Sequence, residues 1–169
     1  MLVIGAGDTS EKAARALCSR GVSDLRVTNR SLDRAQALAQ ALGGRAVPFD
    51  DWAGEFPTID IVISSTSAPH YILDRAQLQG LMRQRKNREL LLIDIAVPRD
   101  IDPDVNFLDD IYLYNVDDLQ AIADDYLQQR KEEITRCEAI IAERVAALLT
   151  PRPMGAPAAH PHIPIPKPQ

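Results

Sequence analysis

The chain has 169 residues, of which 46% are hydrophobic and 25% charged, and its formal net charge is −5 at pH 7. This composition excludes a disordered chain, because it supplies enough apolar side chains for one domain with a core. The negative charge argues against a general binder of nucleic-acid backbones, although a local basic pocket for one phosphate is compatible with it. No apolar run approaches the roughly 18 residues of a membrane span, so none is expected.

Short apolar segments alternate with helical patterns along the first 115 residues. The expected strands are 2–4, 25–28, 45–48, 60–65, 89–96 and 111–114; the expected helices are 10–20, 32–42 and 74–85, with a helical turn at 50–55. Such alternation predicts right-handed crossovers and a parallel sheet that is covered on both faces. The simplest arrangement is an α/β, doubly wound Rossmann-type sheet with strand order 3-2-1-4-5-6.

The chain opens inside the first expected strand, since Met1 is followed at once by residues 2–4 and a glycine. In the predicted order this strand lies at the centre of the sheet. Either the start is natural or the sequence is a piece of a longer protein, and the second explanation is favoured.

From 117 to 149, apolar residues recur at three- and four-residue steps without glycine or proline. This predicts one helix of about 33 residues, roughly 50 Å long. Its apolar stripe cannot all pack on the preceding domain, so we expect it to contact a partner, most simply a second copy of the chain. The alternative is two helices folded back on each other, with a break near Arg130 and Lys131.

The last segment, 151–169, holds seven of the twelve prolines and is expected to be disordered or polyproline-like. His160 and His162 flank a proline there, and no metal site is predicted. The expected organisation is therefore a nucleotide-binding domain at 1–115, a spinal or dimerisation helix at 116–150 and a proline-rich tail at 151–169.

The first candidate site is the segment GAGDTS, which follows a strand and opens a helix. In this G-x-G-x-x-small pattern, the first glycine permits a tight turn and the second lets the backbone approach a diphosphate. Free backbone N–H groups at the helix start would bind that diphosphate. The predicted cofactor-binding residues are Gly5, Ala6, Gly7, Asp8, Thr9 and Ser10; the alternative is a purely structural glycine turn.

The second candidate site, at the end of the second strand, decides which cofactor fits. An acidic residue there would hydrogen-bond the ribose 2′-hydroxyl of NAD, but the sequence has Asn29, Arg30 and Ser31 instead. Arg30 can pair with a 2′-phosphate while the other two donate hydrogen bonds, so NADP(H) is predicted over NAD(H). The alternative is a solvated arginine at a helix start, where the helix dipole disfavours a cation.

Small hydroxyl residues follow the fourth strand. Ser65, Thr66 and Ser67 are expected to leave room for the ribose and nicotinamide of the cofactor, unless they form a generic loop. His70 is a nearby proton donor but is more simply a surface histidine.

No convincing catalytic group is present. Asp94 ends a strongly apolar strand, and Arg99 in the following turn could hold it ionised, although a structural ion-paired turn is the simpler interpretation. Cys18 is expected in the core and Cys137 on the long helix, neither activated as a nucleophile. Two distant cysteines without a zinc motif favour a reducing, cytoplasmic location.

Five motifs together resemble a known family. GAGDTS, TNRS, DIVISSTSAPH, LLIDIAVPRDIDP and YLYNVDDLQ, in this order, are similar to the NADPH-binding domain of glutamyl-tRNA reductase, over residues 2 to 149. The glycine motif and the Asn-Arg pair alone would also fit shikimate dehydrogenase-like domains.

This resemblance implies NADPH-dependent reduction of glutamyl-tRNA to glutamate-1-semialdehyde in tetrapyrrole biosynthesis. It also implies a dimer built around a long spinal helix, with glutamyl-tRNA and the next enzyme, an aminomutase, as partners. The family's catalytic domain, whose cysteine forms a thioester, has no counterpart in this sequence. The chain alone is therefore expected to bind NADPH without reducing glutamyl-tRNA. The alternatives are a free-standing NADP-binding regulatory module and a small independent dehydrogenase.

Overall fold

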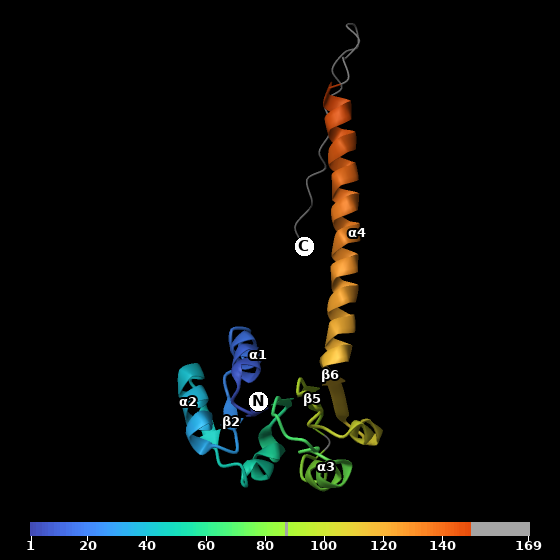
Figure 1. Ribbon diagram of the computed structural model, residues 1–169. Coiled ribbons are helices and arrows are strands. Elements are labelled where there is room, and N and C mark those ends of the chain that lie inside the picture. Colours follow the sequence, from blue (N-terminus) through green and yellow to red (C-terminus); the bar gives the residue numbers. More distant parts are fainter. Residues whose placement is uncertain (87, 150–169) are drawn as a thin grey trace, which may run out of the picture. The chain divides into compact units, whose positions relative to one another are not determined.

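The computed structural model describes residues 1–86 and 88–149. Six parallel strands form one sheet in the order β3-β2-β1-β4-β5-β6 (Figure 1). The strands are β1 (Leu2–Ile4), β2 (Arg26–Thr28), β3 (Arg45–Val47), β4 (Ile61–Ser64), β5 (Leu90–Asp94) and β6 (Ile111–Asn115). The predicted doubly wound order is confirmed. The predicted tail lies outside the described residues.

Helical segments join the strands, and one long helix follows the last strand. They are α1 (Asp8–Cys18), α2 (Leu32–Leu42), α3 (Arg75–Met82), α4 (Val116–Leu149) and the 3₁₀ helices η1 (Trp52–Thr58) and η2 (Pro103–Phe107). The sequence interpretation missed η2, although the signals are present. The Asp102 side chain accepts from the Asp104 N–H, and Pro103 occupies the first helical position.

Two apolar layers cover the sheet, because alternate residues of each strand point to opposite faces. Val3, Val27 and Ile63 pack with buried residues of α1 and α2 on one face. On the other face, Leu2, Ile4 and further strand residues pack with η1, α3 and the loop before β6. From β1, the chain adds strands first toward β3 and then, starting with β4, toward β6 on the other side. A ligand crevice is expected at the carboxyl ends of β1 and β4, where this direction reverses.

A fully buried arginine stabilises the opposite, amino edge of the sheet. The guanidinium of Arg85 donates to the carbonyl oxygens of Phe56, Glu89 (2.8 Å) and Arg88 (3.4 Å). These bonds connect the segment after α3 to η1 and to the start of β5. Arg88, by contrast, is half exposed and pairs with the exposed Asp60.

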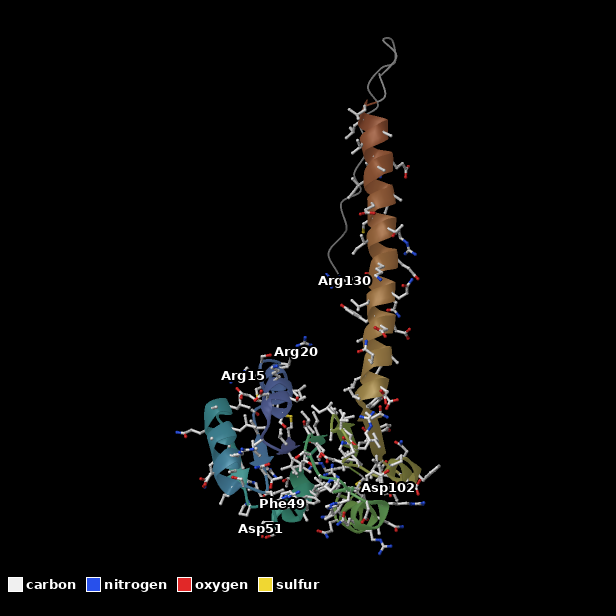
Figure 2. The ribbon with its side chains drawn as sticks, viewed as in Figure 1. Arg15, Arg20, Phe49, Asp51, Asp102 and Arg130 are labelled. Atoms are coloured by element: carbon white, nitrogen blue, oxygen red, sulfur yellow. The ribbon has the colours of Figure 1, made fainter. Side chains whose placement is uncertain are left out.

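Helix α4 runs without interruption from Val116 to Leu149, so the alternative of a break near Arg130 is wrong (Figure 2). The chain divides into two compact units after Ala123, within this helix. None of the residues of α4 is buried, and its exposed apolar residues include Tyr126, Ile134 and Ile141. Among the described residues, no helix combines the length and the hydropathy that crossing a membrane requires.

Candidate functional site

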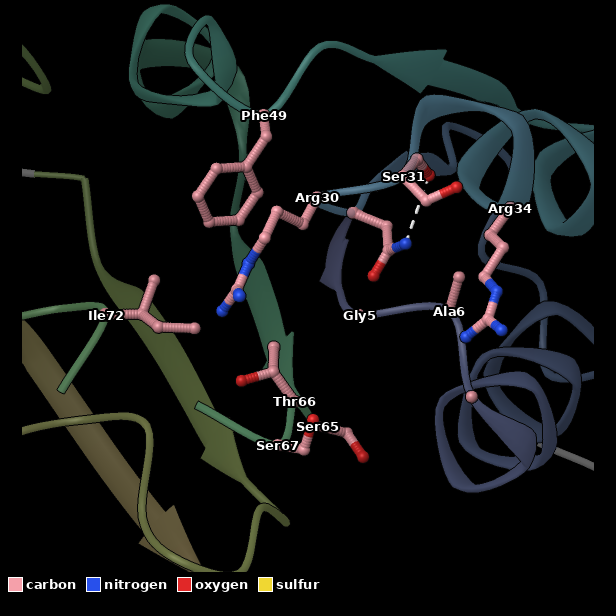
Figure 3. Close-up of a pocket in the computed structure, with 12 residues that line it drawn as sticks. Gly5, Ala6, Arg30, Ser31, Arg34, Phe49, Ser65, Thr66, Ser67 and Ile72 are labelled. Carbon is pink, nitrogen blue, oxygen red and sulfur yellow. Dashed lines mark hydrogen bonds between the residues drawn. The ribbon is translucent and has the colours of Figure 1, made fainter. Parts of the chain in front are cut away.

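A pocket of about 450 Å³ lies where β1, β2 and β4 end (Figure 3). It is lined by predicted site residues from three separate segments of the chain, together with Arg34, Phe49 and Ile72, which the sequence interpretation did not name. The predicted residues that line it are Gly5, Ala6, Gly7, Asn29, Arg30, Ser31, Ser65, Thr66 and Ser67. The structure thus brings together the three predicted segments at one cavity.

The turn after β1 touches the loop after β4 at Gly5. This residue has φ +105°, and a Cβ atom built on it would lie 2.3 Å from the carbonyl oxygen of Ser65. The Gly5 N–H donates to the Thr28 carbonyl at 2.8 Å, and the Ser65 N–H donates to the Ile4 carbonyl at 2.9 Å. Only glycine fits this position, because a side chain would be strained at this φ and its Cβ atom would collide with the Ser65 carbonyl.

Helix α1 begins at this turn with its N–H groups available to a ligand. Gly7 is the N-cap and supplies no side-chain hydrogen bond, and a Cβ on it would contact nothing within 4 Å. Free N–H groups at a helix start favour an anion. Ser10 is buried, and its hydroxyl donates to the Ser65 carbonyl at 3.4 Å, so its contribution is close packing of α1 on the sheet.

Asp8 and Thr9 are exposed in the first turn of α1 and do not line the pocket. Asp8 instead borders a shallow neighbouring depression with Glu11 and Arg34. Because its carboxylate would repel a phosphate, only the backbone N–H of Asp8 could serve the predicted cofactor.

Two arginines enter the pocket without a carboxylate partner. In Figure 3, Arg30 extends beside Phe49 toward Thr66, and Arg34 extends from α2 toward Ala6. Neither guanidinium group forms a hydrogen bond or an ion pair with any residue in the described ranges. Two positive charges at the end of β2 therefore remain available to an anionic ligand.

The place of Arg34 at the pocket could have been predicted from the sequence. It lies four residues after Arg30, in the first turn of α2, and helical side chains there tilt toward the N-terminus. Asn29 is only partly available, since its amide group donates to the Ser31 carbonyl at 3.0 Å.

The three hydroxyl residues of the loop after β4 differ in whether their hydroxyl groups are already hydrogen-bonded within the protein. Thr66 donates its hydroxyl to Asp100 at 2.6 Å and accepts from the Ala68 N–H at 3.1 Å, so its hydroxyl proton is already engaged. No hydrogen bond of the Ser65 or Ser67 hydroxyl is found within the described part of the chain. These two serines are the free donors of the loop.

The suggested pairing of Asp94 with Arg99 is wrong. Asp94 is buried and accepts backbone N–H bonds from Ala96, Asp100 and Ile101, each at 3.0 Å. Burial raises the pKa of Asp94, and these backbone donors oppose the shift. Arg99 pairs with Asp117 at 2.6 Å instead.

The remaining candidates lie away from the pocket. His70 is exposed, Cys18 is half-buried beside the α1 core layer, and Cys137 is exposed on α4; none of them lines the pocket. Across residues 1–86 and 88–149, no group of three or more potential ligands could hold a metal ion.

The sequence profile of the shikimate/quinate 5-dehydrogenase family matches residues 1–122. The chain belongs to this family. The glutamyl-tRNA reductase of Akkermansia muciniphila is 46% identical over 146 residues, which cover 86% of this chain and 43% of that protein. The resemblance to glutamyl-tRNA reductase that the motifs indicate is thereby confirmed.

One solved structure agrees with the similarity to glutamyl-tRNA reductase, and a second shares the fold. The glutamyl-tRNA reductase from Methanopyrus kandleri superposes with a TM-score of 0.76 at 38% identity, over 86% of this chain and 37% of that chain. The nucleotide-binding domain of the Thermoplasma volcanium enzyme shares the fold, with a TM-score of 0.61 at 21% identity over 78% of this chain and 84% of that chain. The chain thus spans less than half of the full-length reductases it matches.

Proposed function

We propose that this chain is the NADPH-binding part of a glutamyl-tRNA reductase, which reduces glutamyl-tRNA to glutamate-1-semialdehyde. The observation that carries the proposal is one pocket that joins a glycine turn at a helix start to two arginines without carboxylate partners. The similarity to reductases over 86% of the chain supports the same assignment.

The residues present fit a phosphorylated dinucleotide. Backbone N–H groups of residues 7–10 would hold the diphosphate, and Arg30 with Arg34 and Ser31 would hold the ribose 2′-phosphate. Ser65 and Ser67 would donate to the ribose and nicotinamide half. When bound, NADPH supplies the hydride for the reduction.

The chain alone is expected to bind NADPH without reducing the substrate. Neither cysteine lies at the pocket, so the thioester-forming cysteine that the family resemblance implies must come from outside the described residues. A cytoplasmic location, expected from the two unpaired cysteines, belongs to the same proposal. An in-frame catalytic domain in the upstream genomic sequence would separate this proposal from a free-standing NADP-binding module.

Replacing Arg30 by alanine is expected to weaken NADPH binding by about 1.5–3 kcal/mol, the usual contribution of a hydrogen bond to a charged group. NADH binding should hardly change, because NADH lacks the 2′-phosphate. Calorimetric titration of both nucleotides measures the difference. Arg34→Ala is expected to act in the same direction, and Arg83→Ala, an exposed arginine outside the pocket, serves as the control. Equal losses for NADPH and NADH would contradict the role given to Arg30.

We further propose that α4 mediates self-association, since it exposes an apolar stripe along its length. Placing Glu at both Ile134 and Ile141 is expected to convert a dimer into a monomer in sedimentation experiments, because two charges would be buried in the interface. Ala139→Glu, on the opposite side of the helix by its 3.6-residue period, should leave the dimer intact. A monomeric parent chain would contradict this assignment.

A further inference from the structure

Asp100 lies in the loop after β5. It binds the loop after β4, which forms one wall of the pocket. It is fully buried, and its carboxylate accepts from the Ser64 hydroxyl at 2.7 Å, the Thr66 N–H at 2.8 Å and the Thr66 hydroxyl at 2.6 Å. These bonds fix the beginning of the loop.

The backbone of the same residue fixes the end of that loop. The Asp100 carbonyl accepts from the N–H groups of Ile72 at 2.6 Å and Leu73 at 3.1 Å. Ile72 lines the pocket, as do the residues that follow Ser64. One residue therefore holds both ends of the segment that forms this wall.

Asp100 is in turn held by Asp94, whose carboxylate accepts the N–H groups of Asp100 and Ile101 at 3.0 Å each. Neither carboxylate has a cationic partner in the described part of the chain. Burying a carboxyl group is costly unless hydrogen bonds compensate it, and here each carboxyl group accepts three. The arrangement is therefore suited to holding a loop in one position.

We propose that Asp100 is a positioning residue for cofactor binding: its buried carboxylate and carbonyl hold residues 64–72 in the conformation that presents Ser65 and Ser67 to the ligand. The inference rests on the proposed NADPH-binding function and adds the residue that shapes one wall of the site. On this inference, the Thr66 hydroxyl, which donates to Asp100, holds the loop rather than the cofactor.

The test uses the full chain with Asp100→Asn, which keeps the size of the side chain but replaces an accepting oxygen by a donating NH₂ group. That group cannot accept from Ser64 or Thr66, so at least one of the three bonds is lost or must reverse, with a hydroxyl oxygen accepting where it now donates. We expect NADPH to bind about tenfold more weakly, the effect of one lost hydrogen bond of ordinary strength. Hydrogen exchange of the Thr66 amide, followed by NMR, should become faster by a similar factor.

Asp102→Asn is the matched control, since Asp102 lies two residues away, caps η2 and does not line the pocket. Its NADPH affinity and its Thr66 exchange rate should equal those of the parent chain. Thr66→Val removes one of the bonds to Asp100 from the other side. Combined with Asp100→Asn, it should weaken NADPH binding by less than the product of the two single effects.

A merely structural role predicts a different pattern. Asp100→Asn would then lower the thermal midpoint while the folded protein, titrated well below that midpoint, bound NADPH as the parent chain does; this result would overturn the proposal. Unchanged Thr66 exchange would also overturn it. If the parent chain bound no NADPH, the proposed function would fall, whereas the exchange rate would still decide whether Asp100 holds the loop.

Discussion

Replacing Gly5 by alanine is expected to destabilise the sheet domain by about 2–4 kcal/mol and to abolish NADPH binding. The methyl group would lie 2.3 Å from the Ser65 carbonyl, and the backbone would keep a φ of +105°, which alanine rarely adopts. Relief requires the loop after β4 to move away from the turn after β1. Urea denaturation and calorimetric titration measure the two effects.

Gly7→Ala separates the two roles of the glycine turn. Gly7 has φ −101°, which alanine tolerates, and its Cβ would contact no protein atom within 4 Å. We expect a loss of less than about 1 kcal/mol of unfolding free energy, as for an alanine at an N-cap. NADPH affinity should nevertheless fall, since the methyl group would occupy space next to the diphosphate. Equal stability losses for Gly5→Ala and Gly7→Ala would contradict the contact described at Ser65.

Arg85→Ala is expected to lower the unfolding free energy by about 3 kcal/mol, because an orphaned buried carbonyl, here that of Phe56, costs about 1–3 kcal/mol. The variant leaves the carbonyl oxygens of Phe56 and Glu89 without the guanidinium donor. Removing the largest fully buried side chain also leaves a cavity. The effect is measured by urea denaturation.

Arg88→Ala is the control for this prediction. Arg88 lies three residues away, is half exposed and pairs with the exposed Asp60, so its loss should cost no more than about 1 kcal/mol. NADPH affinity should be unchanged in both folded variants, because the two arginines lie at the amino edge of the sheet and outside the pocket. Similar losses for Arg85→Ala and Arg88→Ala would indicate that the buried hydrogen bonds contribute little.

The strand order could be predicted because apolar segments alternate with helical patterns, and right-handed crossovers then leave one simple arrangement. Element ends were less predictable. The apolar pattern predicts that the fifth strand continues to residue 96, yet β5 ends at Asp94. At that point the Asp94 carboxylate turns the chain by accepting N–H groups from the following loop, an interaction that apolar periodicity does not report.

The glycine turn and Arg30 could be predicted because each belongs to a local pattern with a fixed spacing. Asp100 could not, since its partners Ser64 and Thr66 lie more than thirty residues earlier in the chain. Several aspartates occur in the same segment, and the sequence does not indicate which one is buried. Proximity in sequence suggests Asp94 as a partner of Arg99, but its partner Asp117 comes from the start of α4.

The basic side chains at the pocket are exposed, so they can change in evolution without disturbing the core. Arg30, Ser31 and Arg34 lie outside both apolar layers, whereas Gly5 is packed against the neighbouring loop. Under the proposed function, substitutions at the three exposed positions are expected to exchange one nicotinamide nucleotide for another with little cost to folding. The proposed NADP(H) preference and the stability of the domain would then depend on different residues, whereas a substitution of Gly5 would affect both dinucleotide binding and folding.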